Sequence, residues 1–479
     1  MAISSFNGGF PGMAGAPVQA ALATNYIDFT ATGNGWAQQY LPDLMEKEAE
    51  VYGKRTIGGF LAQVGAEEAM SADQVIWTEQ GRLHLAYDGV IGGTASNGNV
   101  TIEADANGVT QGANHGIRVG DTVLMASATT TMRGYVKTAD ANDATINVLP
   151  YGAANLSTYF GNTDDVRILV YGSEVKKAST KRDRGNKPQH KSLTNKPIIL
   201  RDYYEISGSD QAQIGWVEVS GEEGQSGYYW YVKAEAETRS RFADHLEMTM
   251  LEAEQAHANS VVENELTAAN DSAGTQGLFD AILKRGHVTT GVTGVNAATD
   301  LAEFDAILAK FDENGAIEEN MMFVNRATAL AMDDMLASMN SYGAGGTSYG
   351  VFNNSEDMAL NLGFSGFRRG SYDFYKSDWK YLNDKGTRGL ITGFAADAIR
   401  GAIIPAGVSS VYDEVMGKNM KRPFLHVRYR ASQTESRKMK SWVTGSVGAV
   451  TSDLDAMEIH YLSERCLVTQ GANNFMLMK

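Results

Sequence analysis

The sequence predicts an α+β protein built from several domains, and three observations lead to this class. Tyr228–Ala258 contains neither glycine nor proline and has helical periodicity. Gly92–Gly172 consists of short apolar or alternating runs broken by Gly, Asn or Asp, which predicts strands. Asp300–Met339 predicts a helix, a strand and a second helix. Because the chain has 479 residues, it is too long for one small core, and roughly two to four domains are expected.

The composition is globular, with 43% hydrophobic and 20% charged residues. The net charge of −16 makes the chain a poor candidate for wrapping nucleic acid, because such binding depends on Lys and Arg contacts to phosphate. The single cysteine, Cys466, excludes an intramolecular disulfide. The first basic residue is Lys47, whereas a secretory signal would need basic residues near its start. No apolar run approaches the ~20 residues of a membrane span. We therefore expect a soluble protein made in a cytoplasm.

The N-terminal part is predicted to be an arm followed by the first elements of the fold. Residues 1–35 are rich in Gly, Ala and Ser and nearly uncharged, which is typical of a segment that orders only against a partner. A helix is expected over Gln38–Tyr52. Strands are expected at Val75–Trp77 and Leu83–Tyr87.

The block 92–172 is predicted to be a β-rich domain inserted into a longer extended segment, because extended character resumes at Pro197–Ile206. An ordinary β domain without a site is the simpler interpretation, and a carbohydrate- or partner-binding module is the alternative. Its candidate strands are Val100–Ile102, Ile117–Met125, Met132–Thr138, Ala144–Leu149 and Val166–Tyr171.

A strongly basic segment follows the block, in an otherwise acidic chain. It holds one acid, Asp183, and seven basic residues: Lys176, Lys177, Lys181, Arg182, Arg184, Lys187 and Lys191. The flanking strands predict that this segment is the tip of a long hairpin. It is either a solvated loop or a docking loop for an acidic neighbour.

The helix Tyr228–Ala258 would be ~45 Å long at 1.5 Å per residue. Glu235 and Arg239 have the favourable i,i+4 order. Because its apolar residues form one narrow stripe, we expect a spine that packs along one side rather than a helix inside a core. The stripe consists of Phe242, Leu246, Met250 and Ala253.

The next segment predicts two capped helices around a strand. Asp300 and Glu303 have the spacing of a capping box for a helix over Asp300–Asp312, and a turn is expected at Asn314–Gly315. A short strand is expected at Met321–Val324, and Asn325 is positioned to cap the second helix. The apolar face of the first helix consists of Leu301, Phe304, Leu308 and Phe311.

The C-terminal part is predicted to be mainly strands. After a loop over Ser341–Ser355, aromatic residues between Phe374 and Tyr381 predict a strand pair with a turn at Lys376–Asp378. Ala396–Pro405 predicts a short helix and turn. Further strands are expected at Gly389–Thr392, Phe424–Tyr429, Trp442–Val450 and Met457–Val468.

No complete catalytic or metal-binding pattern is present in the sequence. Ser348 matches the spacing of a nucleophile elbow but follows a predicted helix, whereas that motif needs a strand-to-helix turn. Glu254 and His257 form one Glu-x-x-His pair, while carboxylate-bridged metal sites need two. Cys466 is interpreted as a buried structural thiol. We therefore predict neither an enzyme nor a cofactor.

The order of these elements resembles the major capsid proteins of tailed bacteriophages across nearly the whole chain, most specifically over Gln276–Met339. The resemblance implies that family's shell fold, with an arm, an extended hairpin loop carrying a β-rich insertion, a spine helix, and peripheral and axial domains. The implied parts are an N-terminal arm over 1–60, an extended loop over 61–210 with the insertion at 92–172, a peripheral domain over 211–274 with the spine helix 228–258, an axial domain over 275–400, and returning peripheral strands over 401–479.

The resemblance also implies a function. Copies of the chain would form hexamers and pentamers of an icosahedral head that encloses double-stranded DNA without sequence-specific binding, with the basic segment as a contact between subunits. It implies a virion protein assembled in the bacterial cytoplasm without a membrane, and a separate scaffolding protein, a portal and a possible cement protein as partners. Two alternatives remain: a carbohydrate- or receptor-binding virion surface protein that uses the 92–172 block, and a hydrolase that uses Ser348.

Overall fold

The computed structural model divides the chain into two compact units, Thr78–Leu193 and the described parts of Met1–Trp77 with Thr194–Lys479. The α+β class is confirmed, because both units contain strands and the larger one also contains the long helices. The residues described are 59–61, 66–80, 84–105, 108, 110–111, 115–139, 143–178, 190–209, 229–257, 260–262, 273–315, 317–341, 366–391, 398–406, 408–413, 418–446 and 451–479.

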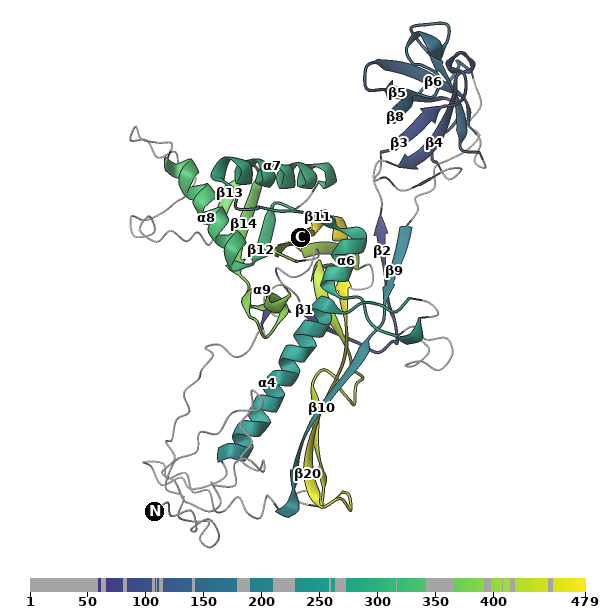
Figure 1. Ribbon diagram of the computed structural model, residues 1–479. Coiled ribbons are helices and arrows are strands. Elements are labelled where there is room, and N and C mark those ends of the chain that lie inside the picture. Colours follow the sequence, from purple (N-terminus) through teal and green to yellow (C-terminus); the bar gives the residue numbers. More distant parts are fainter. Residues whose placement is uncertain are drawn as a thin grey trace, which may run out of the picture. The chain divides into compact units, whose positions relative to one another are not determined.

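The smaller unit is a closed barrel of six antiparallel strands, connected in the order β3-β4-β7-β6-β5-β8 (Figure 1). Closure leaves no unpaired sheet edge. Its first strand precedes Gly92, so the barrel begins earlier than the 92–172 block. The strands are β3 (Ala86–Ile91), β4 (Asn99–Asp105), β5 (Asp121–Ala126), β6 (Thr131–Ala139), β7 (Thr145–Pro150) and β8 (Asp165–Ser173).

The barrel interior is filled by alternate residues of its strands. Val123, Val136 and Val148 are fully buried, as expected when one face of each strand points inward. Gly134 is required by this packing, because a Cβ there would lie 2.6 Å from a methyl group of Val148. The two 3-10 turns, η3 (Ala95–Asn97) and η5 (Leu156–Thr158), each contribute one buried residue to the barrel core.

The chain enters and leaves the barrel through two strands that pair with each other. These are β2 (Val75–Gln80) and β9 (His190–Asn195), which form a two-stranded sheet. The strands nearest to them in sequence, β3 and β8, pair within the barrel instead. The two strands that flank the barrel in the sequence therefore pair with each other.

The larger unit contains a sheet of five strands that is covered on one face by a single long helix (Figure 1). The strands are β1 (Ala66–Met70), β18 (Leu425–Arg430), β20 (Ala456–Thr469), β10 (Ile198–Ser207) and β19 (Lys440–Gly445). β20 is the central strand: its second half pairs with β18, while its first half pairs with both β10 and β19. β1 lies parallel to β18, and the other pairs are antiparallel.

A second sheet of the larger unit has six strands in the order β11-β21-β15-β12-β14-β13. Helices α7 (Ala297–Asn314) and α8 (Arg326–Ser341) pack on it through a core that includes Phe304, Phe311 and Met332. The strands are β11 (His287–Thr289), β21 (Met476–Met478), β15 (Gly401–Pro405), β12 (Glu319–Val324), β14 (Tyr372–Asp378) and β13 (Gly366–Arg369).

The remaining elements of the larger unit are short. Helix α6 (Leu278–Arg285) and helix α9 (Lys380–Asn383) contribute residues to the core that also contains Phe323 and Trp379. Strands β16 (Val408–Asp413) and β17 (Lys418–Pro423) form a separate antiparallel pair. The 3-10 turns are η8 (Arg388–Leu390) and η9 (Ala472–Asn474).

The predicted cap of α8 is confirmed, and the predicted cap of α7 is wrong. Asn325 caps α8 as predicted, since its side-chain oxygen accepts the Thr328 N–H at 2.8 Å. The capping box of α7 is wrong, because this helix begins earlier and Asn296 accepts the Thr299 N–H at 3.0 Å. Asp300 instead accepts the Gly294 N–H at 2.8 Å and so fixes the loop before the helix.

Several predicted elements in the C-terminal half are wrong. Gly389–Thr392 was expected as a strand, but Arg388–Leu390 is a 3-10 turn. Ala396–Pro405 was expected to be a short helix and turn, but Gly401–Pro405 form strand β15, which is buried at every residue. The aromatic segment Phe374–Tyr381 was expected to turn at Lys376–Asp378, but these three residues belong to β14, which pairs with the preceding strand β13.

Strands β15 and β21 also correct the expected division of the chain. Both lie within 401–479, which was expected to return to the sheet beside the spine helix. They belong instead to the six-stranded sheet, where β15 pairs with β12 and β21, and β21 also pairs with β11. The helix expected at Gln38–Tyr52 and the loop at 342–355 lie outside the described residues.

Candidate assembly surfaces

Helix α4 (Tyr229–Glu252) corresponds to the expected spine helix, but it is shorter than expected, because the described residues 253–257 are not helical. Phe242, Leu246 and Met250 are almost fully buried, whereas Ala253 lies just beyond the helix and is half-buried. Phe242 and Leu246 pack on the sheet in a small cluster with Ile206, Met457, Ile459 and Tyr461. The helix therefore covers one face of β10 and β20 by a narrow stripe.

The short segment Gly59–Leu61 is anchored on this helix. The Gly59 N–H donates to Glu247 Oε1 at 2.6 Å. The ring of Phe60 stacks on Trp379 at 4.5 Å and meets Phe323 edge-on at 4.7 Å. Burial raises the pKa of the Glu247 carboxyl, and the N–H groups of Gly59 and Phe60 partly oppose this. The last residues of the expected N-terminal arm are thus held by an aromatic contact and a buried acceptor.

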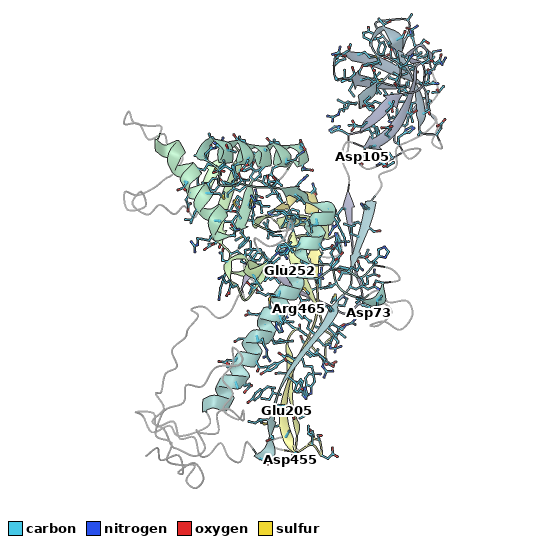
Figure 2. All side chains as sticks on the ribbon, viewed as in Figure 1. Asp73, Asp105, Glu205, Glu252, Asp455 and Arg465 are labelled. Carbon is cyan, nitrogen blue, oxygen red and sulfur yellow. The ribbon has the colours of Figure 1, made fainter. Side chains whose placement is uncertain are left out.

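A network of ion pairs fixes β1 and the residues after it to the sheet. Glu68 pairs with Arg428 at 2.8 Å, and Arg430 contacts both Asp73 and Glu464. Arg465 is buried beneath this network, and burial lowers the pKa of its guanidinium against the opposing effect of nearby carboxylates. Figure 2 labels Asp73 and Arg465 in this part of the sheet. Glu464 is the buried carboxylate of this network, and a buried charge that loses its partners is strongly destabilising.

The basic segment is divided between described and undescribed residues. Lys176 and Lys177 follow β8 and are exposed, and Lys191 is exposed in β9. Lys181, Arg182, Arg184 and Lys187 lie outside the described residues. The prediction that this segment is a hairpin tip is wrong, because β8 pairs with β3 and β5 while β9 pairs with β2. The segment is the connection from the barrel back to β9.

The sheet face opposite α4 carries a cleft that the sequence reasoning missed. Along β10 and β20 the residues alternate, so Arg201, Tyr203 and Leu462 point away from the helix. The Trp442 ring stacks on His460 at 5.1 Å, and His460 lies 6.0 Å from Tyr203. The cleft has a volume of about 460 Å³ and is lined by Arg201, Glu435, Arg437, Lys440, Trp442 and Leu462.

Basic side chains surround the Trp442 ring in this cleft. The Arg201 guanidinium carbon and the Lys440 ammonium each lie 5.8 Å from the centre of the Trp442 ring. Lys440 also pairs with Glu435, and Arg437 pairs with Glu464 at 2.7 Å. The period-2 pattern at Pro197–Ile206 was visible in the sequence. Its partner strands were not, because they are more than 200 residues away.

The candidate catalytic and metal-binding residues of the sequence form no such site in the described part of the chain. No group of three or more His, Cys, Asp or Glu side chains that could hold a metal is found there. Glu254 and His257 follow the end of α4, and Ser348 lies outside the described residues. Cys466 is fully buried, as predicted, and burial raises the pKa of its thiol to about 12. Among the described helices, none is long and apolar enough to cross a membrane.

Comparison with known proteins finds similarity only among solved structures. No protein-family model and no curated protein sequence matches the chain. The structure named "Microbacterium phage Oxtober96" aligns with 95% of this chain and 99% of its own, at 9% identity and a TM-score of 0.37. The capsid of cyanophage P-SCSP1u aligns with 64% of this chain and 80% of its own, at 10% identity and a TM-score of 0.34.

A third match is the mature capsid of bacteriophage PhiM1, which aligns with 64% of this chain and 78% of its own, at 9% identity and a TM-score of 0.32. The solved structures to which this chain is similar thus include bacteriophage capsids, the class of protein that the sequence resembles.

Proposed function

We propose that the chain is a structural shell protein, the major capsid protein of a tailed bacteriophage. Copies would assemble in the bacterial cytoplasm into hexamers and pentamers of an icosahedral head that encloses double-stranded DNA. A separate scaffolding protein, a portal and a possible cement protein would act with it. The chain would perform no catalysis and would need no cofactor.

The observation that carries the proposal is the half-covered five-stranded sheet. Helix α4 covers β10 and β20 on one face through Phe242 and Leu246. On the other face Ile199 and Tyr203 are more than half exposed, and no described element packs over them. Large exposed apolar surface beside charged groups is typical of interaction sites. A subunit that meets several neighbours in a shell would cover this face.

The charge distribution supports assembly rather than nucleic-acid binding. The chain carries a net charge of −16, and its basic side chains on the five-stranded sheet are mostly paired with Glu or Asp. Phosphate binding would require a row of unpaired Lys and Arg. The sheet instead offers local charge complementarity, which sets register and partner choice between protein subunits.

Sedimentation velocity of the purified chain over a range of concentrations tests this function. We expect slow subunits or capsomers at low concentration, and fast-sedimenting closed particles above a threshold or when the scaffolding protein is co-expressed. A folded chain that sediments as a monomer under all of these conditions would contradict the proposal.

The barrel supports a second candidate, a carbohydrate- or receptor-binding role at the virion surface. Its outer side exposes Leu149, Tyr151, Leu169 and Tyr171, which lie on β7 and β8 or just after them. Aromatic side chains with an exposed ring face are suited to flat, partly apolar ligands. Binding of the chain to arrays of glycans, lost in Tyr151→Ala together with Tyr171→Ala, would favour this candidate.

A further inference from the structure

Directly before β20 the chain has a short acidic segment with an apolar centre, Asp453–Asp455, which is called the tip here. Asp453 and Asp455 are exposed on either side of Leu454, whose side chain is 45% exposed. The backbone of the tip is fixed, because the Leu454 carbonyl accepts the N–H groups of Ser446 at 3.1 Å and Ala456 at 2.8 Å. The tip therefore presents an apolar side chain between two carboxylates from a defined backbone position.

The cleft on the same sheet has the complementary composition. It places Arg201, Arg437 and Lys440 around the apolar surface of Trp442 and Leu462. Lys440 already pairs with Glu435, which also lines the cleft, and Arg437 pairs with Glu464. Among the described residues, no carboxylate pairs with Arg201, which is exposed. An apolar side chain entering this cleft would bury the indole and leucine surface, while a carboxylate beside it would meet the Arg201 guanidinium.

The tip of one chain cannot occupy its own cleft. Leu462 lies six residues along β20 from Ala456, which is ~20 Å for an extended strand. In Figure 2, Asp455 lies at the end of the sheet, well away from Arg465, which is close in sequence to Leu462. A contact between these two surfaces would therefore join two copies of the chain.

We propose that the tip Asp453–Asp455 of one copy inserts into the Arg201–Arg437–Lys440–Trp442 cleft of a second copy. This inference rests on the proposed function, because it names a contact through which the shell protein would associate. The contact is head-to-tail: each copy would use its tip on one neighbour and its cleft on another. Such contacts close into a ring when the rotation between copies allows it.

Introduced cysteines test the geometry directly. The only natural cysteine, Cys466, is fully buried and so does not compete. The double variant Lys440→Cys with Leu454→Cys should form disulfides between chains on mild oxidation, giving a ladder of dimers, trimers and larger species on a non-reducing gel. Each single variant should give at most dimers. A double variant that gives no more than the single variants would overturn the inference.

A charge exchange tests the electrostatics. Arg201→Glu should raise the concentration needed for assembly at least about tenfold, and adding Asp453→Arg should restore most of the loss. Arg239→Glu is the matched control, because Arg239 is exposed on α4, on the other side of the sheet, and should leave assembly unchanged. Circular dichroism of each variant checks that the fold is retained.

The outcomes separate this contact from the proposed function. If the wild-type chain forms particles while Arg201→Glu assembles normally and no ladder forms, the contact is wrong and the shell function stands. If the wild-type chain does not associate at all, both are wrong.

Discussion

The packing of α4 on the five-stranded sheet makes a quantitative prediction at Leu246. This side chain is 3% exposed and lies against Ile206, Ile459 and Tyr461. Truncating a buried leucine to alanine typically costs 2–5 kcal/mol, with the larger values where the cavity cannot collapse. Since the cluster is small and lies beneath a single helix, we expect partial collapse and a cost of about 3 kcal/mol for Leu246→Ala.

Leu246→Asp should be more damaging, because it places a carboxylate in the same apolar site. We expect this variant to be insoluble or strongly destabilised, by several kcal/mol. The neighbouring residue His245 is exposed on the same helix, so His245→Ala is the matched control and should change stability by less than about 0.5 kcal/mol.

Urea denaturation followed by circular dichroism measures these effects. Leu246→Ala should lower the midpoint without changing the slope of the transition. If Leu246→Ala unfolds at the wild-type midpoint, or if Leu246→Asp is soluble with unchanged melting, then α4 is not packed on the sheet and the reasoning fails.

Other predictions concern separate parts of the fold. Because burial raises the pKa of Glu247, ionising it costs stability as the pH rises from about 4.5 through the folded pKa, so Glu247→Gln should be more stable than wild type at neutral pH and equal to it near pH 4; superimposable pH profiles would contradict this. Asn325→Ala should cost about 1 kcal/mol in urea unfolding, and no loss would mean that the cap is unimportant. A fragment over residues 84–178 should fold alone and give a dispersed β-type NMR spectrum, whereas an unfolded fragment would show that the barrel needs the rest of the chain. Glu substitutions at Lys181, Arg182 and Arg184 should leave the subunit folded but block assembly, and normal assembly would show that the basic segment is only solvated.

Local sequence patterns predicted the elements whose signals are local. The run Met457–Val468 predicted β20, and Asn325 predicted the start of α8. These signals lie within a few residues of the element, so no tertiary information was needed. The barrel strands were recognisable for the same reason, since each alternates between core and solvent.

The errors arise where long-range pairing decides the structure. β2 pairs with β9 and β3 pairs with β8, so the basic segment after β8 is not a hairpin tip, although its two flanking strands suggested one. β15 pairs with β12 and β21, which come from distant parts of the chain, and it is buried because Ala402 and Ile404 face one core and Ile403 faces another. No local pattern contains these pairings.

The anchoring of Phe60 and the cleft around Trp442 could not be found for a related reason. Phe60 is an isolated aromatic residue whose partners, Phe323 and Trp379, are more than 260 residues away. The cleft combines residues from β10, β19 and β20 and from the loop before β19. Its cations are scattered in the sequence and form a group only when the three strands are in register.

Electron cryomicroscopy of the purified chain, alone and after co-expression with its scaffolding protein, tests the central claim most directly. We predict closed particles in which copies of this chain are grouped in fives and sixes, with α4 and the five-stranded sheet visible in every copy. Well-folded monomers or small discrete oligomers, with no closed particle under either condition, would contradict it.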